Sequence, residues 1–305
     1  MTKRNKAFLS LAFICIIWGT TYLALRVAVV KFPAFLFAAI RQVVSGVIIL
    51  LIAKKMNPTV DLSRKNIKHQ LLVGFLLITL GNGLVSWAEK YIPSGVAALI
   101  CSLMPLIAVI FNLVRYREDH INFPIAIGMI LGFGGVALIF KDDWSNLSNT
   151  KYLIGIVATF IATASWAIGS IINKKKSSPI NPIFNAGLQV LLGGLLLLFF
   201  SPLMDNYATF DNFFQADVII SLLYLIVFGS VLAYTAYMFA LRELPVGIVT
   251  LYAYVNPLVA VILGYLILHE TLTIYTLLAF ISIISGVYIV NWGYQRQHKK
   301  RDSLS

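Results

Sequence analysis

Arg41 is the residue whose type and position most clearly allow chemistry. It lies about eight residues inside an apolar segment at 33–53, roughly 12 Å along a helix that rises about 1.5 Å per residue. An ionised side chain at that depth in a bilayer costs about 3 kcal/mol or more, which makes it a candidate for a functional role. No Asp or Glu lies deep in an apolar segment to pair with it, so its partners must be carbonyls, amides, water or a substrate anion. Arg41 could contact substrate, or it could only fix its helix to neighbouring carbonyls.

Aromatic and amide side chains recur inside the other apolar segments. Rings and amides together can hold an amphipathic metabolite through stacking and a few hydrogen bonds. The same side chains can instead serve helix packing or anchoring at the membrane surface. We predict a central cavity whose substrate-binding residues are Arg41 with Trp18, Tyr22, Asn82, Trp166, Tyr234, Tyr252 and Asn256.

Pro105 and Pro257 are matched prolines in the middle of two apolar segments. A proline removes a backbone donor and leaves the carbonyl four residues earlier, here at Cys101 and Ala253, without its usual partner. The pair is therefore predicted to form hinges, with fixed kinks for packing as the alternative.

The remaining reactive residue types form no catalytic or metal-binding pattern. The two cysteines have no metal or disulfide spacing, and no Gly-x4-Gly-Lys-Ser/Thr phosphate-binding sequence occurs. We therefore predict no enzyme activity, no cofactor and no metal. The four histidines are scattered through loops and the tail, at positions 69, 120, 269 and 298.

The carboxylates lie outside the centres of the apolar segments. Glu89 and Glu270 fall at outer ends, and Glu118 falls in an inner loop. The sequence therefore predicts that no carboxylate serves as a proton site at the membrane midplane.

Apolar segments long enough to cross a bilayer follow one another along the whole chain. Hydrophobic residues make up 59% of it and charged residues 12%, about half the charge of a soluble domain. About 20 apolar residues suffice for one crossing. We expect an all-α polytopic membrane protein with ten transmembrane helices, near 7–29, 33–53, 70–89, 94–114, 123–141, 152–173, 182–201, 217–241, 246–268 and 275–293.

The net charge of +12 reflects membrane topology and not nucleic-acid binding. With the N-terminus in the cytoplasm, 18 Lys and Arg lie on the inner side and 4 on the outer side, while Arg26 and Arg41 lie within spans. This is the positive-inside distribution. It predicts a multi-pass protein of the cell (inner) membrane with both termini cytoplasmic.

The chain repeats itself. Trp18, Arg41 and Gly46 match Trp166, Gln189 and Gly194 at an offset of 148, and the sequence around Pro105 recurs around Pro257 at an offset of 152. We expect a first repeat at 1–145 and a second at 146–305. Each would hold five spans, and because that number is odd the second repeat would be inverted relative to the first.

These residues resemble a known family. A Trp-Gly pair in the first span, an Arg in the second, a Pro-Leu pair in the fourth and a Gly-Glu-like end of the ninth appear here as Trp18-Gly19, Arg41, Pro105-Leu106 and His269-Glu270. The chain is similar to the EamA family of the drug/metabolite transporter superfamily, although the family usually has Gly in place of His269. The resemblance implies two five-helix repeats and secondary transport of small metabolites, often export of amino acids or related compounds.

The expected partners are a small-molecule substrate and the lipid bilayer. The expected mechanism is alternating access around a midplane cavity. An intramembrane enzyme acting on lipid-linked substrates, or a lipid flippase, is the alternative. The substrate, the direction of transport, the coupling ion and the oligomeric state stay open.

Overall fold

The computed structural model describes residues 2–116, 122–142, 149–176, 180–244, 249 and 252–302, and the regular structure in these ranges is entirely helical. The all-α fold class is therefore confirmed. Glu118 and residues 245–248 lie outside the described residues. The helices of the first half are α1 (Lys3–Val29), α2 (Ala34–Met56), α3 (Arg64–Gly74), η1 (Phe75–Asn82), α4 (Gly83–Ala88), α5 (Ser94–Cys101), α6 (Met104–Tyr116) and α7 (Phe123–Asp142). Those of the second half are α8 (Thr150–Lys176), α9 (Pro182–Met204), η3 (Tyr207–Phe214), α10 (Ala216–Tyr224), η4 (Leu225–Leu232), α11 (Ala233–Glu243), α13 (Tyr252–Leu268) and α14 (Ile274–Asp302).

Most of these helices are apolar on all sides. In the described ranges, 8 helices are long and apolar enough to cross a membrane, and two shorter apolar stretches occur at Phe123–Gly135 and Val255–Leu268. Large apolar side chains such as Leu51 and Phe199 are exposed on the outside of the bundle. Such a surface suits lipid, which is as apolar as the side chains themselves.

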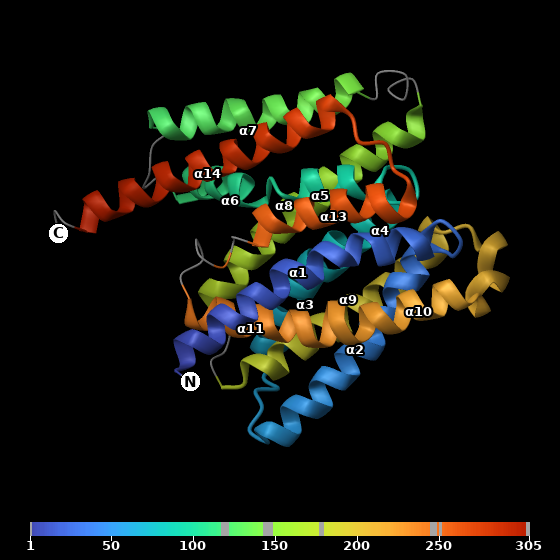
Figure 1. Cartoon of the computed structure of the whole chain (residues 1–305). Coiled ribbons are helices and arrows are strands. Elements are labelled where there is room, and N and C mark those ends of the chain that lie inside the picture. The colour runs from blue at the N-terminus through green and yellow to red at the C-terminus, as the bar shows by residue number, and fades with distance from the viewer. Residues whose placement is uncertain are drawn as a thin grey trace.

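Two helix pairs make the most extensive contacts: α2 with α9, and α7 with α14. Figure 1 shows α7 and α14 side by side along one edge of the bundle, and it shows α1 beginning and α14 ending at the same end of the bundle. Glycines allow this close packing. A Cβ atom at Gly286 of α14 would lie 2.5 Å from the backbone nitrogen of Gly132 in α7.

Three spans are interrupted where the chain surrounds the centre of the bundle. The π-helical segments η1 and η4 interrupt α3–α4 and α10–α11 at corresponding places in the two halves. Such wide turns are frequent at functional sites. The third interruption separates α5 from α6 at Ser102 and Leu103, just before Pro105, whereas Pro257 lies inside the continuous helix α13. The matched prolines thus have different local consequences.

His269 reverses the chain after α13 and positions Glu270. Its φ angle of 53° lies in the left-handed region, where glycine is favoured over a residue with a side chain. The Glu270 N–H then donates to the Gly264 carbonyl at 3.0 Å. The Glu270 carboxylate accepts from the backbone N–H groups of Ser94 and Gly95 at 2.8 and 3.2 Å, and so it caps the N-terminus of α5.

Replacing His269 with glycine is expected to raise the unfolding midpoint. The left-handed conformation costs a residue with a side chain about 1–2 kcal/mol, and the exposed imidazole gives up little packing. After the entropic cost of glycine is subtracted, we expect the free energy of unfolding to increase by up to about 1 kcal/mol. Thermal unfolding of the purified protein in detergent measures it. Thr271→Gly, an exposed neighbour without positive φ, is the control and should gain nothing; a lower midpoint for His269→Gly would contradict the prediction.

Candidate functional site

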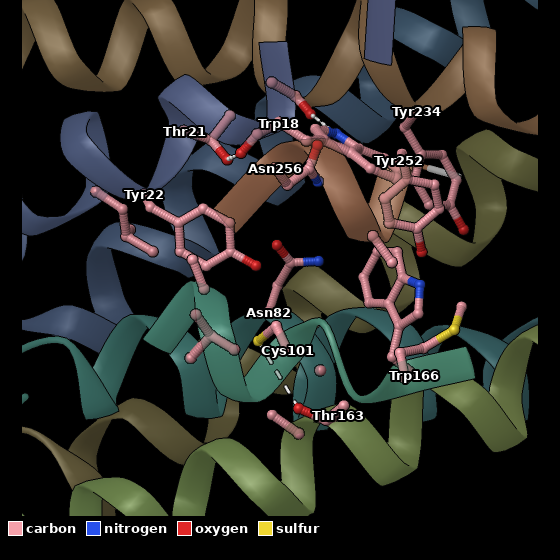
Figure 2. Close-up of a pocket in the computed structure, with 18 of the residues that line it drawn as sticks. Trp18, Thr21, Tyr22, Asn82, Cys101, Thr163, Trp166, Tyr234, Tyr252 and Asn256 are labelled. Atoms are coloured by element: carbon pink, nitrogen blue, oxygen red, sulfur yellow. Dashed lines mark hydrogen bonds between the residues drawn. The ribbon is translucent and has the colours of Figure 1, made fainter. Parts of the chain in front are cut away.

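A cavity of about 120 Å³ lies at the centre of the bundle, where both halves meet (Figure 2). Its walls come from α1, α2, η1, α4, α5, α6, α8, η4, α11 and α13. Each substrate-binding residue predicted from the sequence lies in these walls, although the residues are spread from position 18 to position 256. Of the two predicted hinge prolines, Pro257 lines the cavity and Pro105 is absent from its lining.

Aromatic rings form one wall of the cavity. The Trp18 ring lies perpendicular to Trp166 and nearly so to Tyr252, with centroid distances of 5.8 and 5.0 Å. Tyr237 lies behind them, 5.1 Å from Trp18. The Trp18 Nε1–H donates to the Gly229 carbonyl of η4 at 3.1 Å, so the π-helical segment fixes this ring. The wall offers an apolar surface against which a ring or an aliphatic chain can pack.

Arg41 of α2 supplies a positive charge to the lining of the cavity. It is buried, and its Nε–H donates to the Ser230 hydroxyl of η4 at 2.9 Å. A Cβ atom on Gly229 would lie 3.1 Å from Arg41 Nη2, so the absence of a side chain there leaves room for the guanidinium. The sequence led us to expect carbonyl, amide, water or anion partners; the hydroxyl of Ser230, 189 residues away, was missed because sequence spacing says nothing of such distant pairs.

Neutral polar groups face the remaining space. Figure 2 shows Asn82 and Asn256 extending toward each other from opposite sides of the cavity, with the Tyr22 hydroxyl beside Asn82. The Asn82 Nδ2–H makes only a long hydrogen bond of 3.4 Å, to the Leu77 carbonyl inside its own π-helical segment. Amides and hydroxyls of this kind can serve as both donors and acceptors for a bound molecule.

Polar lining residues that were not among those predicted come mainly from the interrupted helices and from α8. Gln42 adjoins Arg41, and the Thr163 hydroxyl is 3.7 Å from Cys101 Sγ. Gln42 directly follows Arg41 in the same apolar segment, so its polar side chain there was the sequence signal that could have indicated it. Ser102 and Ser230 could be found only by knowing where α5 ends and where η4 lies. In the residues described, no group of three or more His, Cys, Asp or Glu comes together to hold a metal.

Buried amides continue from the cavity wall toward the starts of α3 and α9. The Tyr234 hydroxyl donates to Gln189 Oε1 at 2.6 Å, and Gln189 Nε2 donates to Gln70 and Asn173 at 2.6 and 2.9 Å. Gln70 in turn donates to Asn66 at 2.8 Å. Every link is neutral, so Gln189 stabilises the packing of α3, α8, α9 and α11 without placing a charge there. Its repeat mate Arg41 faces the cavity instead, and the two halves are electrostatically unequal.

Glu89 departs most from the sequence-based expectation. The sequence places it at the outer end of a span, where a carboxylate would reach water, but its side chain is completely buried. The Arg26 guanidinium, which could have extended to the membrane surface, donates to the backbone carbonyl of Glu89 instead. Within the part of the chain that the structure describes, neither carboxyl oxygen of Glu89 has a hydrogen-bond partner. Helix α8 packs closely over this turn because Gly155 has no side chain; a Cβ atom there would lie 2.9 Å from Ile92.

Comparison with known proteins connects this fold to a single family. The profile of the EamA-like transporter family matches residues 5–141 and again residues 153–292. The uncharacterized inner membrane transporter YedA of Escherichia coli K12 is 30% identical, and the match covers 91% of this chain and 88% of YedA. Protein PecM of Dickeya dadantii is 29% identical over 90% of this chain and 88% of its own length, and the uncharacterized transporter YvbV of Bacillus subtilis is 27% identical over 94% and 92%. A solved crystal structure with 16% identity superposes with a TM-score of 0.68, covering 94% of this chain and 97% of that one, and so shares the fold.

Proposed function

This chain belongs to the EamA-like transporter family, and we propose that it is a secondary transporter that exports amino acids or related small metabolites. Family membership and the names of its relatives indicate a multi-pass membrane transporter and not an enzyme. The observation that carries the proposal is the central cavity, in which one buried arginine, several neutral amides and hydroxyls, and a wall of aromatic rings face the same space.

The proposed substrate is amphipathic and carries a carboxylate. Arg41 would meet that carboxylate with paired N–H donors, which is the geometry that the planar guanidinium provides. Trp18, Trp166 and Tyr252 would pack against the apolar part, and Asn82 and Asn256 would bind the polar groups between them. Tyr22 and Tyr234 complete the proposed binding residues.

The proposed architecture has ten spans in two inverted repeats, at 1–145 and 146–305. The two short apolar stretches in α7 and α13 would complete the eight longer spans. The separate family matches to each half and the corresponding positions of η1 and η4 support the duplication. Five spans in each repeat would give the two halves opposite orientations in the membrane.

Alternating access would then follow from rocking of the halves around the cavity. Pro105 and Pro257 are the proposed hinges; the helix break before Pro105 supports the first of them. We place both termini in the cytoplasm and the chain in the inner membrane. The inner excess of Lys and Arg supports this, as does the position of both chain ends at one end of the bundle (Figure 1).

A flux screen tests the proposal. Purified protein in lipid vesicles is offered radiolabelled amino acids, nucleosides and sugars, and we expect saturable transport of one or more amino acids in unchanged chemical form. Trp166→Ala, which removes part of the cavity wall, should lower this flux, whereas Trp292→Ala on the exposed surface of α14 should not. A chemically altered label would indicate an enzyme, movement of lipid alone would indicate a flippase, and either result would overturn the proposal.

A further inference from the structure

Glu89 is a buried acid outside the cavity described above. It follows Ala88, the last residue of the third span, and its N–H donates to the carbonyl of Val85 at 3.0 Å. Val85 lines the cavity, so Glu89 lies one helical turn beyond it on the same segment. Its side chain is completely buried, and both carboxyl oxygens lack a hydrogen-bond partner among the described residues. An ionised carboxylate in such a place would lose its hydration without gaining a hydrogen bond in return.

Arg26 is the cation that could serve as a counter-ion for Glu89, but its side chain does not pair with the carboxylate. Its guanidinium donates to the Glu89 backbone carbonyl, and no ion pair between the two side chains occurs among the described residues. Burial raises the pKa of Glu89 well above its ordinary value; Arg26 and Arg41 oppose this, and Glu270 adds to it. The charged and titratable groups within electrostatic range are Tyr22 and Arg26 on α1, Arg41 on α2, Cys101 on α5 and Glu270 after α13.

We propose that Glu89 is a proton-binding site that couples transport to a proton gradient. The proposal rests on the transport function proposed above and names its energy source. In the present conformation the neutral acid is buried beside Arg26. When this end of the bundle opens, water reaches the carboxyl group, the proton leaves to the solvent, and the Arg26 guanidinium is free to move from the backbone carbonyl to the carboxylate. For an exporter the proton would move opposite to the substrate.

The direction of the pH effect follows from this assignment. The conformation that buries Glu89 holds a proton that the open conformation releases. Raising the pH through the range in which Glu89 titrates therefore shifts the equilibrium away from the buried conformation, and lowering the pH restores it. Because Glu89 lies outside the cavity, the coupling acts through this conformational change and not through competition for one site.

Infrared spectroscopy of the purified, full-length protein in lipid vesicles tests the site without any substrate. We expect the absorption of a protonated carboxyl group at neutral pH, and its loss as the pH is raised further, because burial favours the neutral form of the acid. Glu89→Gln should abolish this band. Glu243→Gln, at a partly exposed position beside Arg242, should leave it intact. A band that survives Glu89→Gln, or none in the wild type, would overturn the proposal.

A flux measurement tests the coupling. With radiolabelled amino acids as the probe and the membrane potential held at zero, a difference of about one pH unit can sustain at most about tenfold accumulation per proton exchanged. We expect Glu89→Gln to lose this accumulation and to keep exchange of labelled for unlabelled amino acid; accumulation at the wild-type level would overturn the coupling. If the wild type moves no amino acid, the proposed function fails, and the infrared result still decides whether Glu89 binds a proton. If Glu89→Gln does not fold, the infrared measurement is made on Glu89→Asp instead. We expect the carboxyl band to shift in that variant, and an unshifted band would show that the absorption belongs to another group.

Discussion

Replacing Arg41 with lysine is expected to weaken binding of a carboxylate substrate about 10-fold to 100-fold in a protein that still folds. Lysine keeps the positive charge but loses the planar pair of donors and the Nε–H that now bonds to Ser230 at 2.9 Å. Hydrogen bonds to charged groups contribute about 1.5–3 kcal/mol, which gives the expected range. Arg41→Gln should weaken binding further, because it removes the charge as well. Equilibrium binding of the labelled substrate from the flux screen to purified protein measures both.

Two further variants separate substrate contact from a structural role of Arg41. Arg242→Lys makes the same substitution at an exposed position of α11 and should change neither affinity nor unfolding midpoint. Ser230→Ala keeps the guanidinium but removes its partner, so it should lower affinity less than Arg41→Lys does. Wild-type affinity in well-folded Arg41→Lys and Arg41→Gln would show that Arg41 does not touch the substrate. Loss of folding in both would show that Arg41 serves to fix α2 to η4.

The residues of the cavity could be predicted from the sequence because two independent constraints coincide there. Lipid excludes polar side chains, so the few that remain inside apolar segments, such as Asn82 and Asn256, must face protein or a cavity. The duplication then indicates that equivalent segments meet at the centre. Together these constraints gathered residues from distant segments, although they gave no distances and no hydrogen-bond partners.

The burial of a side chain at the end of a span, near the membrane surface, could not be predicted in this way. Hydropathy locates Glu89 along its helix but says nothing about the helices around it. Whether an acid at a helix end reaches water depends on how closely a neighbour packs, and here Gly155 lets α8 cover the turn. The π-helical segments were also missed, because nothing in an apolar run such as Phe75–Asn82 distinguishes a wider turn from a regular one.

The repeat mates Arg41 and Gln189 show how a duplicated fold can become asymmetric. They occupy equivalent positions on α2 and α9. Arg41 faces the cavity, whereas Gln189 belongs to a hydrogen-bonded network of neutral side chains. A charge at both positions would place two cations near one cavity, each needing its own counter-ion in a poorly hydrated interior. With a neutral Gln189, the only full charge lining the described cavity is Arg41, and the substrate anion would have a single electrostatic anchor.

The contact between α2 and α9 depends on a second pair of repeat mates, Gly46 and Gly194. A Cβ atom at Gly46 would lie 2.5 Å from the backbone nitrogen of Leu191, and one at Gly194 would lie 2.8 Å from that of Val43. Backbone atoms cannot rotate away as the end of a side chain can, so the helices must separate. Since α2 also carries Arg41, such a separation would displace the guanidinium from Ser230.

We therefore expect Gly46→Ala and Gly194→Ala each to lower stability by about 1–3 kcal/mol, the usual cost of overpacking, and to reduce substrate affinity. The double variant should cost less than the two single changes together, because one separation of the helices relieves both clashes. Gly134→Ala is the matched control: a Cβ atom there meets nothing within 4 Å, and alanine favours a helix, so its unfolding midpoint should stay the same or rise. Thermal unfolding in detergent compares the variants. Equal midpoints for Gly46→Ala and Gly134→Ala would mean that α2 and α9 do not pack this closely in the protein.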